Sequence, residues 1–210
     1  MVKTFRRGPS KDMSVRYQLF RQVIIALGWL LVGFTVHGAE KVPKEGPLIV
    51  AANHRRYVDP VFVSMAVPRR LQWMGKKELF IFPFERLFFF LGVFPVDRKK
   101  GGHAALRAAL NLLTAGWALG IFPEGTRRGG YNLDHTPKGG VGMLTIRGGA
   151  PVLPVFVGRT PSLFRRLRGG KLCVYIGDPI TSHNNTKEKG VYREVTDEVL
   201  HAIYRLGEKK

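Results

Sequence analysis

Residues 47–60 read PLIVAANHRRYVDP. The apolar run at the start of this stretch is typical of a buried strand that leads into a loop. Asp59 followed by Pro60 predicts the start of a helix, with Asp59 as the N-cap and Pro60 in the first turn. The helix would continue as VFVSMAV and end before Pro68. The stretch therefore predicts a buried strand, a polar loop and a helix in immediate succession.

The same alternation continues towards the C-terminus. Apolar runs followed by turn residues predict further strands in LQWMGKKELF, GVFPVDR, WALGIFPEGTR, APVLPVFVG and KLCVYIG. Helical patterns are found at residues 103–116, 139–149 and 186–206. This order predicts an α/β fold with a mostly parallel sheet flanked by helices. Ligands bind such sheets beyond the carboxyl ends of the strands, where NHRRYVD, VDR and FPEGTR would converge.

The segment before this domain is apolar and preceded by basic residues. Residues 23–36 read VIIALGWLLVGFTV, and a helix of this length spans about 21 Å, less than the roughly 30 Å of a hydrocarbon core. We expect an uncleaved helix lying in one leaflet, with a tilted single span as the alternative. A secretory signal is a third interpretation, which the lack of a small-residue cleavage site disfavours. We assign residues 1–40 to this membrane-associating helical segment and residues 41–210 to the α/β domain.

The chain is strongly basic, with 34 Lys and Arg against 15 Asp and Glu and a formal net charge of +19. Such a charge predicts a polyanionic partner, either nucleic acid or an anionic membrane surface. The basic residues form three groups, namely Lys3, Arg6, Arg7, Lys11, Arg16 and Arg21; Arg69, Arg70, Lys76 and Lys77; and Arg159, Arg165, Arg166, Arg168 and Lys171. Two groups adjoin strongly apolar stretches, residues 23–36 and the Phe-rich residues 79–92, which favours a membrane. The sequence carries no recognised nucleic-acid-binding module, so that class is the weaker alternative.

Neither thiol nor metal chemistry is indicated. The single cysteine, Cys173, lies in an apolar run and is expected to be a buried, unreactive thiol. The six His are scattered along the sequence, and we expect no metal site. The sequence contains no G-x-S-x-G elbow and no Walker-type loop, so it does not indicate a covalent intermediate on serine or a nucleotide site.

Four stretches follow one another in order: NHRRYVD (53–59), GVFPVDR (92–98), FPEGTR (122–127) and VLPVF (152–156). Together they resemble the four motifs of the glycerolipid acyltransferase family, whose best-known bacterial members are 1-acylglycerol-3-phosphate acyltransferases. His-x4-Asp alone is a weak match, but FPEGTR is specific and the ordered set extends over residues 45–160. One departure is Arg56, which stands where family members often have a small hydroxyl residue.

The resemblance implies a catalytic role for His54 and Asp59. Acyl transfer to a hydroxyl needs a base that removes the hydroxyl proton, and a neutral imidazole suits this near pH 7. His54 would be that base, and Asp59 would orient its ring and stabilise the imidazolium. Along an α-helix, side chains five residues apart diverge by about 140°, so the two can meet only across a turn.

The resemblance and the chemistry of phosphate recognition assign further residues. Planar guanidinium groups bind phosphate through paired hydrogen bonds. The expected phosphate-binding residues are Arg98, Glu124, Arg127 and Lys138. The residues expected to shape a turn or a pocket are Gly125, Thr126 and Pro154.

The expected activity is transfer of a fatty acyl chain from a thioester to the 2-hydroxyl of 1-acylglycerol-3-phosphate, which gives phosphatidic acid. The co-substrate would be acyl-CoA or acyl carrier protein, with no bound cofactor. The expected partners are an anionic phospholipid membrane, a lysophospholipid and the donor carrier, at the cytoplasmic face of the inner or plasma membrane. One alternative is acylation of another lysolipid, such as a lyso-ornithine lipid. A second is a protein that binds lipid without catalytic activity, which the presence of both His54 and Asp59 disfavours.

Overall fold

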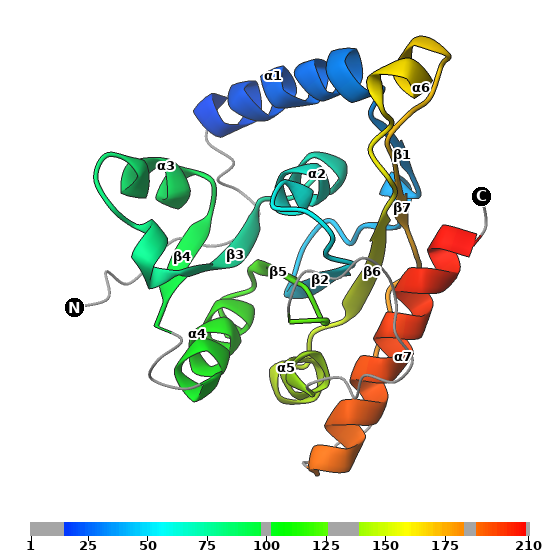
Figure 1. The fold of residues 1–210 in the computed structure, drawn as a ribbon. Helices are drawn as coiled ribbons and strands as arrows, with labels where there is room; N and C mark the ends of the chain where they lie inside the picture. The colour runs from blue at the N-terminus through cyan, green and yellow to red at the C-terminus, as the bar shows by residue number, and fades with distance from the viewer. Residues whose placement is uncertain (1–14, 98–101, 126–138, 183–187, 209–210) are drawn as a thin grey trace.

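A mostly parallel sheet forms the centre of the molecule (Figure 1). The computed structural model describes residues 15–97, 102–125, 139–182 and 188–208, and within them the sheet has seven strands in the order β1-β7-β6-β2-β5-β3-β4. The strands are β1 (Thr35–His37), β2 (Leu48–Ala52), β3 (Leu71–Lys76), β4 (Val93–Val96), β5 (Ala118–Ile121), β6 (Val152–Val157) and β7 (Cys173–Ile176). The predicted α/β fold is confirmed.

The strand pairings bring two of the motif loops together. β2 pairs in parallel with both β5 and β6, and β3 pairs in parallel with β4 and β5. β7 is antiparallel to β6, so the sheet is mixed on that side. Because β2 and β5 are neighbours, the loops carrying His54 and Glu124 leave the sheet side by side. β3 separates β4 from β5, so Asp97 leaves the same edge farther away.

Helices cover both faces of the sheet. The α-helices are α1 (Val15–Val32), α2 (Asp59–Ala66), α3 (Phe84–Phe90), α4 (Gly102–Thr114), α5 (Gly140–Gly148), α6 (Leu163–Leu167) and α7 (Lys189–Glu208), and the 3-10 helices are η1 (Ala39–Lys41) and η2 (Lys77–Leu79). On one face, Leu48 and Val50 of β2 pack in a cluster with Val63 of α2. On the other, Ile49 and Ala51 pack with side chains of α4, α5 and α7. Every residue of β2 is buried, as expected for a strand covered on both faces.

The N-terminal helix ends earlier than predicted. Gly33 has a left-handed backbone (φ 63°), its N–H donates to Trp29 O (3.0 Å), and the Phe34 N–H reaches the carbonyl six residues back. This pattern is typical of a helix that ends at glycine. Residues Thr35–His37 then join the sheet as β1 beside β7, so the prediction of a helix through the whole apolar run is wrong at its C-terminal end. Next to this short edge strand, Cys173 is half-buried, where a buried thiol was predicted.

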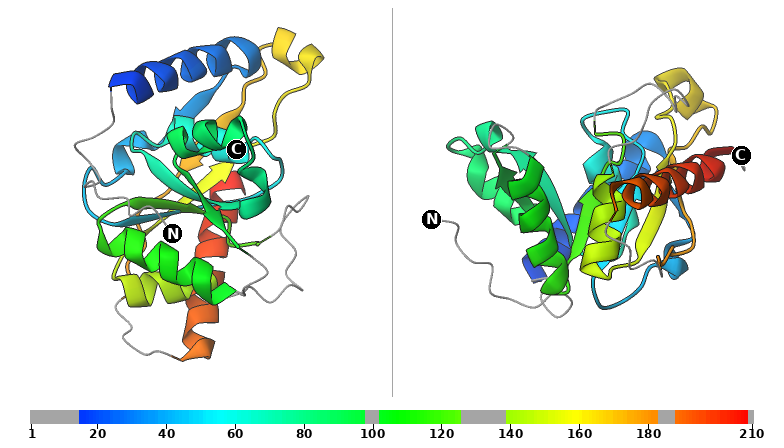
Figure 2. Two further views of the ribbon diagram at one scale, coloured as in Figure 1. Left: turned by 90° about the vertical axis from the view of Figure 1, so that its left-hand side faces the viewer. Right: turned by 90° about the horizontal axis from the view of Figure 1, so that it is seen from below.

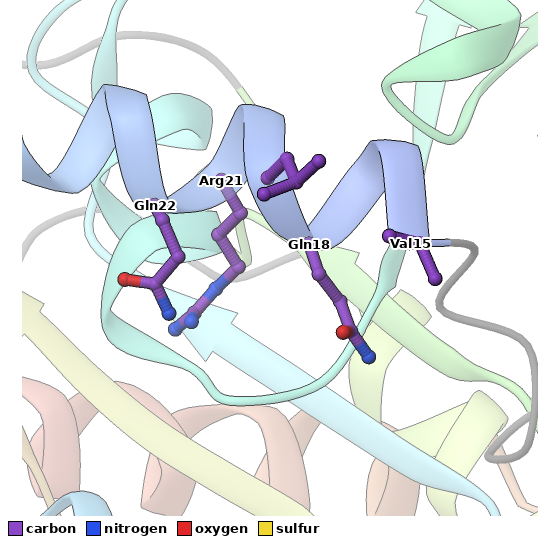
Figure 3. Close-up of a pocket in the computed structure, with 5 residues that line it drawn as sticks. Val15, Gln18, Arg21 and Gln22 are labelled. Atoms are coloured by element: carbon purple, nitrogen blue, oxygen red, sulfur yellow. The ribbon is translucent and has the colours of Figure 1, made fainter.

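α1 turns a charged side chain inward and apolar side chains outward. Arg21 donates to Met65 O (2.7 Å) at the end of α2, and Figure 3 shows it projecting from α1 towards the body of the domain. The exposed large apolar residues of α1 are Val15, Leu19, Val23, Leu27, Trp29, Leu30 and Leu31. By length and composition α1 is able to cross a membrane, and only 6% of it is buried. An outward apolar face of this kind is typical of helices that associate with a bilayer.

The Phe-rich segment places much of its apolar surface in solvent rather than in the core. It forms η2 and α3 at the end of the molecule where β3 and β4 lie (Figure 1). Its exposed large apolar residues are Leu79, Ile81, Phe82, Phe84, Leu87 and Phe89.

Candidate active site

Asn53 ties the loop after β2 to the neighbouring strand. Its side chain is 1% exposed, and its Nδ2 donates to Val157 O (3.1 Å) while its Oδ1 accepts from the Val157 N–H (2.7 Å). The two bonds extend the contact between β2 and β6 beyond the last residue of β2. The following residue, His54, therefore starts from a fixed position at the carboxyl end of the strand.

Asp59 closes the loop that begins at His54. Its Oδ2 accepts hydrogen bonds from the N–H groups of Arg55 and Arg56, both at 2.6 Å. The expected N-cap role of Asp59 is wrong, because Val58 occupies the N-cap and Asp59 is the first residue of α2, with no side-chain cap bond. The carboxylate instead turns back to satisfy two loop N–H groups, as short acidic side chains often do in turns.

The structure brings His54 and Asp59 together. Nδ1 of His54 lies 3.2 Å from Oδ2 of Asp59, which is 3% exposed. The imidazole stacks on the ring of Phe122, with centroids 3.9 Å apart and planes 15° apart. Phe122 in turn stacks on Trp73, whose Nε1 donates to Ser64 Oγ (3.0 Å). The imidazole is thus held at its edge by a carboxylate and on its face by the ring of Phe122, which is itself backed by Trp73.

This arrangement selects one tautomer of His54. The Asp59 carboxylate accepts the Nδ1–H, which leaves the lone pair on Nε2. The hydrogen bonds among the described residues do not engage Nε2, and the side chain is 19% exposed. Nε2 is therefore able to accept a proton from a bound molecule.

Glu124, in the turn after β5, is joined to the histidine loop. Its Oε1 accepts from the His54 backbone N–H (3.2 Å) and from the Tyr204 hydroxyl (2.6 Å) of α7. Burial raises the pKa of the Glu124 carboxyl, although the hydrogen bonds from Tyr204 and His54 act in the opposite direction. Its Oε2 is buried and has no hydrogen-bond partner among the described residues. The Glu124 carboxyl group therefore connects the turn after β5 to the histidine loop and to helix α7.

Gly125 completes the turn after β5. Its N–H donates to Phe122 O (3.0 Å), and its φ of 69° is a conformation that favours glycine. The turn thus places Phe122 against the imidazole of His54 and Glu124 against the His54 backbone N–H.

Comparisons with known proteins identify the family of the chain. The sequence profile of a family described as Acyltransferase matches residues 33–158, which include β1 to β6 and all four motif stretches. The chain belongs to the acyltransferase family. It is 30% identical over 150 residues to the 1-acyl-sn-glycerol-3-phosphate acyltransferase of Bacillus subtilis, covering 70% of this chain and 74% of that protein. It is 33% identical over 191 residues to the protein of the same name from Saccharomyces cerevisiae, covering 85% of this chain and 63% of that one.

The solved structures include a matching member of the same family. The crystal structure of the 1-acyl-sn-glycerophosphate (LPA) acyltransferase PlsC from Thermotoga maritima superposes with a TM-score of 0.67 at 25% identity, covering 94% of this chain and 83% of that one. The predicted membership of the glycerolipid acyltransferases and the assignment as an enzyme are thereby confirmed. The chain spans a little under two thirds of the length of some relatives, such as the yeast protein.

The remaining predicted site residues of this acyltransferase fall into two groups. Pro154 lies inside β6 opposite Ala51 of β2, and its carbonyl accepts from the Gly177 N–H (2.9 Å). At Pro154 the regular pairing between β6 and β7 is interrupted, and the next pair is the Val152–Ile180 bridge. A strand tolerates proline at such an interruption, because no ladder hydrogen bond is needed from its nitrogen. The other four predicted residues lie outside the described part of the chain: Arg98, Thr126, Arg127 and Lys138.

Four residues of the acyltransferase site were not singled out from the sequence. Asn53 and Phe122 are the first residues of NHRRYVD and FPEGTR, so their place in these motifs could have marked them as site residues. Trp73 and Tyr204 lie far from the motifs in sequence, and no local pattern marks them. Their contacts depend on β3 lying beside β5 and on α7 lying against the sheet.

The hollow that the described residues form along α1 lies away from the motif loops. It is lined by Val15, Gln18, Leu19, Arg21 and Gln22 (Figure 3). None of the motif residues lines it, so it does not support a substrate site. Among the described residues, no group of three His, Cys, Asp or Glu is arranged to hold a metal ion.

Proposed function

We propose that this acyltransferase moves a fatty acyl chain from a thioester to the 2-hydroxyl of 1-acylglycerol-3-phosphate, which gives phosphatidic acid. The observation that carries the proposal is His54, held by Asp59 at Nδ1 and stacked on Phe122 so that Nε2 remains available. The names of the relatives support the acceptor, since they are 1-acyl-sn-glycerol-3-phosphate acyltransferases in both bacteria and yeast.

In the proposed reaction, Nε2 of His54 takes the proton of the acceptor hydroxyl while the hydroxyl oxygen attacks the thioester carbonyl. The new C–O bond forms and the C–S bond breaks, so the thiolate leaves. The imidazolium returns its proton to the thiolate, which restores neutral His54. Asp59 stabilises the imidazolium in between, without an acyl-enzyme intermediate.

Substrate phosphate would be bound by basic residues that follow β4 and β5. Arg98 and Arg127, with Lys138, are suited to this by the geometry and charge of their side chains. Arg127→Ala and Arg98→Ala should each raise the KM for lysophosphatidic acid about tenfold or more and leave the donor KM nearly unchanged. Loss of donor affinity instead would assign these arginines to the phosphates of the donor.

The proposed setting is the cytoplasmic face of the inner or plasma membrane. The support is the exposed apolar face of α1 together with a formal charge of +19, which suits a leaflet rich in anionic lipid. Acyl-CoA and acyl carrier protein are both available there as donors, and the protein would hold no resident cofactor.

A direct test is an acyl-transfer assay with the purified full chain in detergent. Radiolabelled acyl-CoA and acyl carrier protein would each be offered with lysophosphatidic acid, a lyso-ornithine lipid and other lysophospholipids. The expected product is phosphatidic acid, formed with at least one donor. Acylation of the lyso-ornithine lipid with no phosphatidic acid formed would replace the proposed acceptor by the alternative.

A further inference from the structure

The short helix α6 holds apolar side chains out in solvent. Leu163, Phe164 and Leu167 are 77%, 62% and 79% exposed. Ser162 caps the helix by accepting from the Arg165 N–H (3.4 Å), and the Gly170 N–H bonds back to Arg165 O (2.7 Å) at its other end. A capped and closed turn of this kind presents its apolar side chains in a defined conformation, and exposed apolar clusters of this kind usually have a partner.

α6 is joined to the C-terminal end of α1. Arg166 donates through Nη2 to the carbonyls of Trp29 and Leu30, both at 3.3 Å. The Leu172 N–H, just after α6, donates to Val32 O (2.9 Å). Figures 1 and 2 show α6 beside this end of α1, on the same side of the sheet. α6 therefore lies beside the end of α1 that carries the exposed Trp29, Leu30 and Leu31.

The segment that contains α6 carries charge of one sign. Residues 159–171 contain five Arg and Lys and no Asp or Glu. Arg165, Arg168 and Lys171 are exposed, and the Arg168 guanidinium lies 4.0 Å from the centroid of the Phe164 ring. Apolar side chains with flanking cations match the interface of an anionic bilayer, where the apolar groups enter the acyl boundary and the cations meet phosphate.

We propose that α6 is a second membrane-docking element, which inserts Leu163, Phe164 and Leu167 into the interface of an anionic bilayer beside the end of α1. The inference rests on the membrane association in the proposed function and adds the surface that orients the domain. Continuity with α1 favours a bilayer over a second copy of the chain or an acidic carrier protein. Two linked contacts would hold the sheet in one orientation relative to the lipid, which a single helix would not do.

The charge contribution is tested with matched variants of the full chain. Arg165→Glu with Arg168→Glu removes two exposed cations, one in α6 and one at its C-cap. Arg193→Glu with Arg205→Glu removes two exposed cations from α7, on the other face of the sheet. Both pairs lower the formal net charge equally. On vesicles of phosphatidylcholine with added phosphatidylglycerol, the α6 pair should weaken partition by about tenfold or more, and the α7 pair should change it much less. If both pairs weakened vesicle binding equally, the effect would come from the net charge of the chain alone, and the proposal would be overturned.

Insertion is tested with a fluorescent probe at Leu167. Leu167→Cys in a Cys173→Ser chain gives a single labelling position for an environment-sensitive dye. Its emission should shift to the blue when the chain binds the anionic vesicles. An unchanged emission in vesicle-bound protein would overturn the proposal, as would a shift caused only by an acidic carrier protein or by self-association. Acyl transfer by the unmodified chain in detergent is measured separately, so a failure of the proposed function leaves the vesicle result readable.

Discussion

The Tyr204 hydroxyl donates a 2.6 Å hydrogen bond to Oε1 of Glu124, although 80 residues of sequence separate the two. The same oxygen accepts the backbone N–H of His54. The C-terminal helix α7 thereby supports the loop that carries the proposed general base. Tyr204 is a positioning residue in this arrangement, because its hydroxyl reaches the His54 loop through Glu124.

Tyr204→Phe removes the hydroxyl and little else. We expect a loss of about 1 kcal/mol in the free energy of unfolding and a fall in kcat of about tenfold as His54 shifts, with the donor KM unchanged. Tyr192→Phe is the matched control, since its hydroxyl accepts from Arg147 (3.0 Å) on α5 and not from a site residue. If both variants lose stability equally and neither loses kcat, Tyr204 is only structural.

The raised pKa of Glu124 predicts how stability depends on pH. Between the ordinary pKa of 4.5 and the raised pKa of the folded state, the Glu124 carboxyl is ionised in the unfolded chain but still protonated in the folded one. The contribution of Glu124 to the free energy of unfolding therefore falls as the pH rises through this interval. Glu124→Gln does not titrate and should therefore become more stable relative to the unmodified protein over that interval. Urea denaturation at a series of pH values measures the difference, with the exposed Glu198→Gln as the control. A difference that falls with rising pH would contradict the assigned direction.

Substitution of the His54–Asp59 pair should abolish most of the activity. His54→Ala should lower kcat about 100-fold or more, because positioned acid-base groups contribute roughly 10²- to 10⁴-fold. Asp59→Asn should be less severe, since the amide oxygen still accepts from the loop N–H groups, and circular dichroism should show an intact fold. His201 and Asp197 form a pair with a 3.4 Å contact on α7, and their matching substitutions should leave kcat unchanged. Near-normal turnover of His54→Ala would exclude the proposed mechanism.

Asn53 should matter for stability more than a typical polar residue. Asn53→Ala leaves the N–H and the carbonyl of Val157 without partners, and a buried unpaired group costs about 1 to 3 kcal/mol. We expect a loss of roughly 2 kcal/mol or more in the free energy of unfolding, together with a lower kcat. Asn111→Ala, at an exposed position of α4, should stay within about 0.5 kcal/mol of the unmodified protein. Equal stabilities for the two variants would show that the Asn53 contacts are not maintained in solution.

The sequence by itself determined the fold class and the loops that form the site. Buried strands produce continuous apolar runs, and helices produce their own period, so both are visible locally in stretches such as residues 47–60 and 103–116. Because the strands are parallel, the segments after β2 and β5 had to emerge at one edge. The order of the four motifs then indicated the family without any coordinates.

Only the tertiary structure decided how segments distant in sequence meet. The apolar run from residue 23 has no internal sign that Thr35–His37 will pair with β7, a contact across about 140 residues. Asp59 matched an N-cap locally, but the nearby N–H groups of Arg55 and Arg56 captured its carboxylate instead. The contact between Tyr204 and Glu124 depends on how α7 is placed against the sheet. Periodicity reports which face of an element is apolar, whereas these contacts depend on where each element lies in the assembled layers.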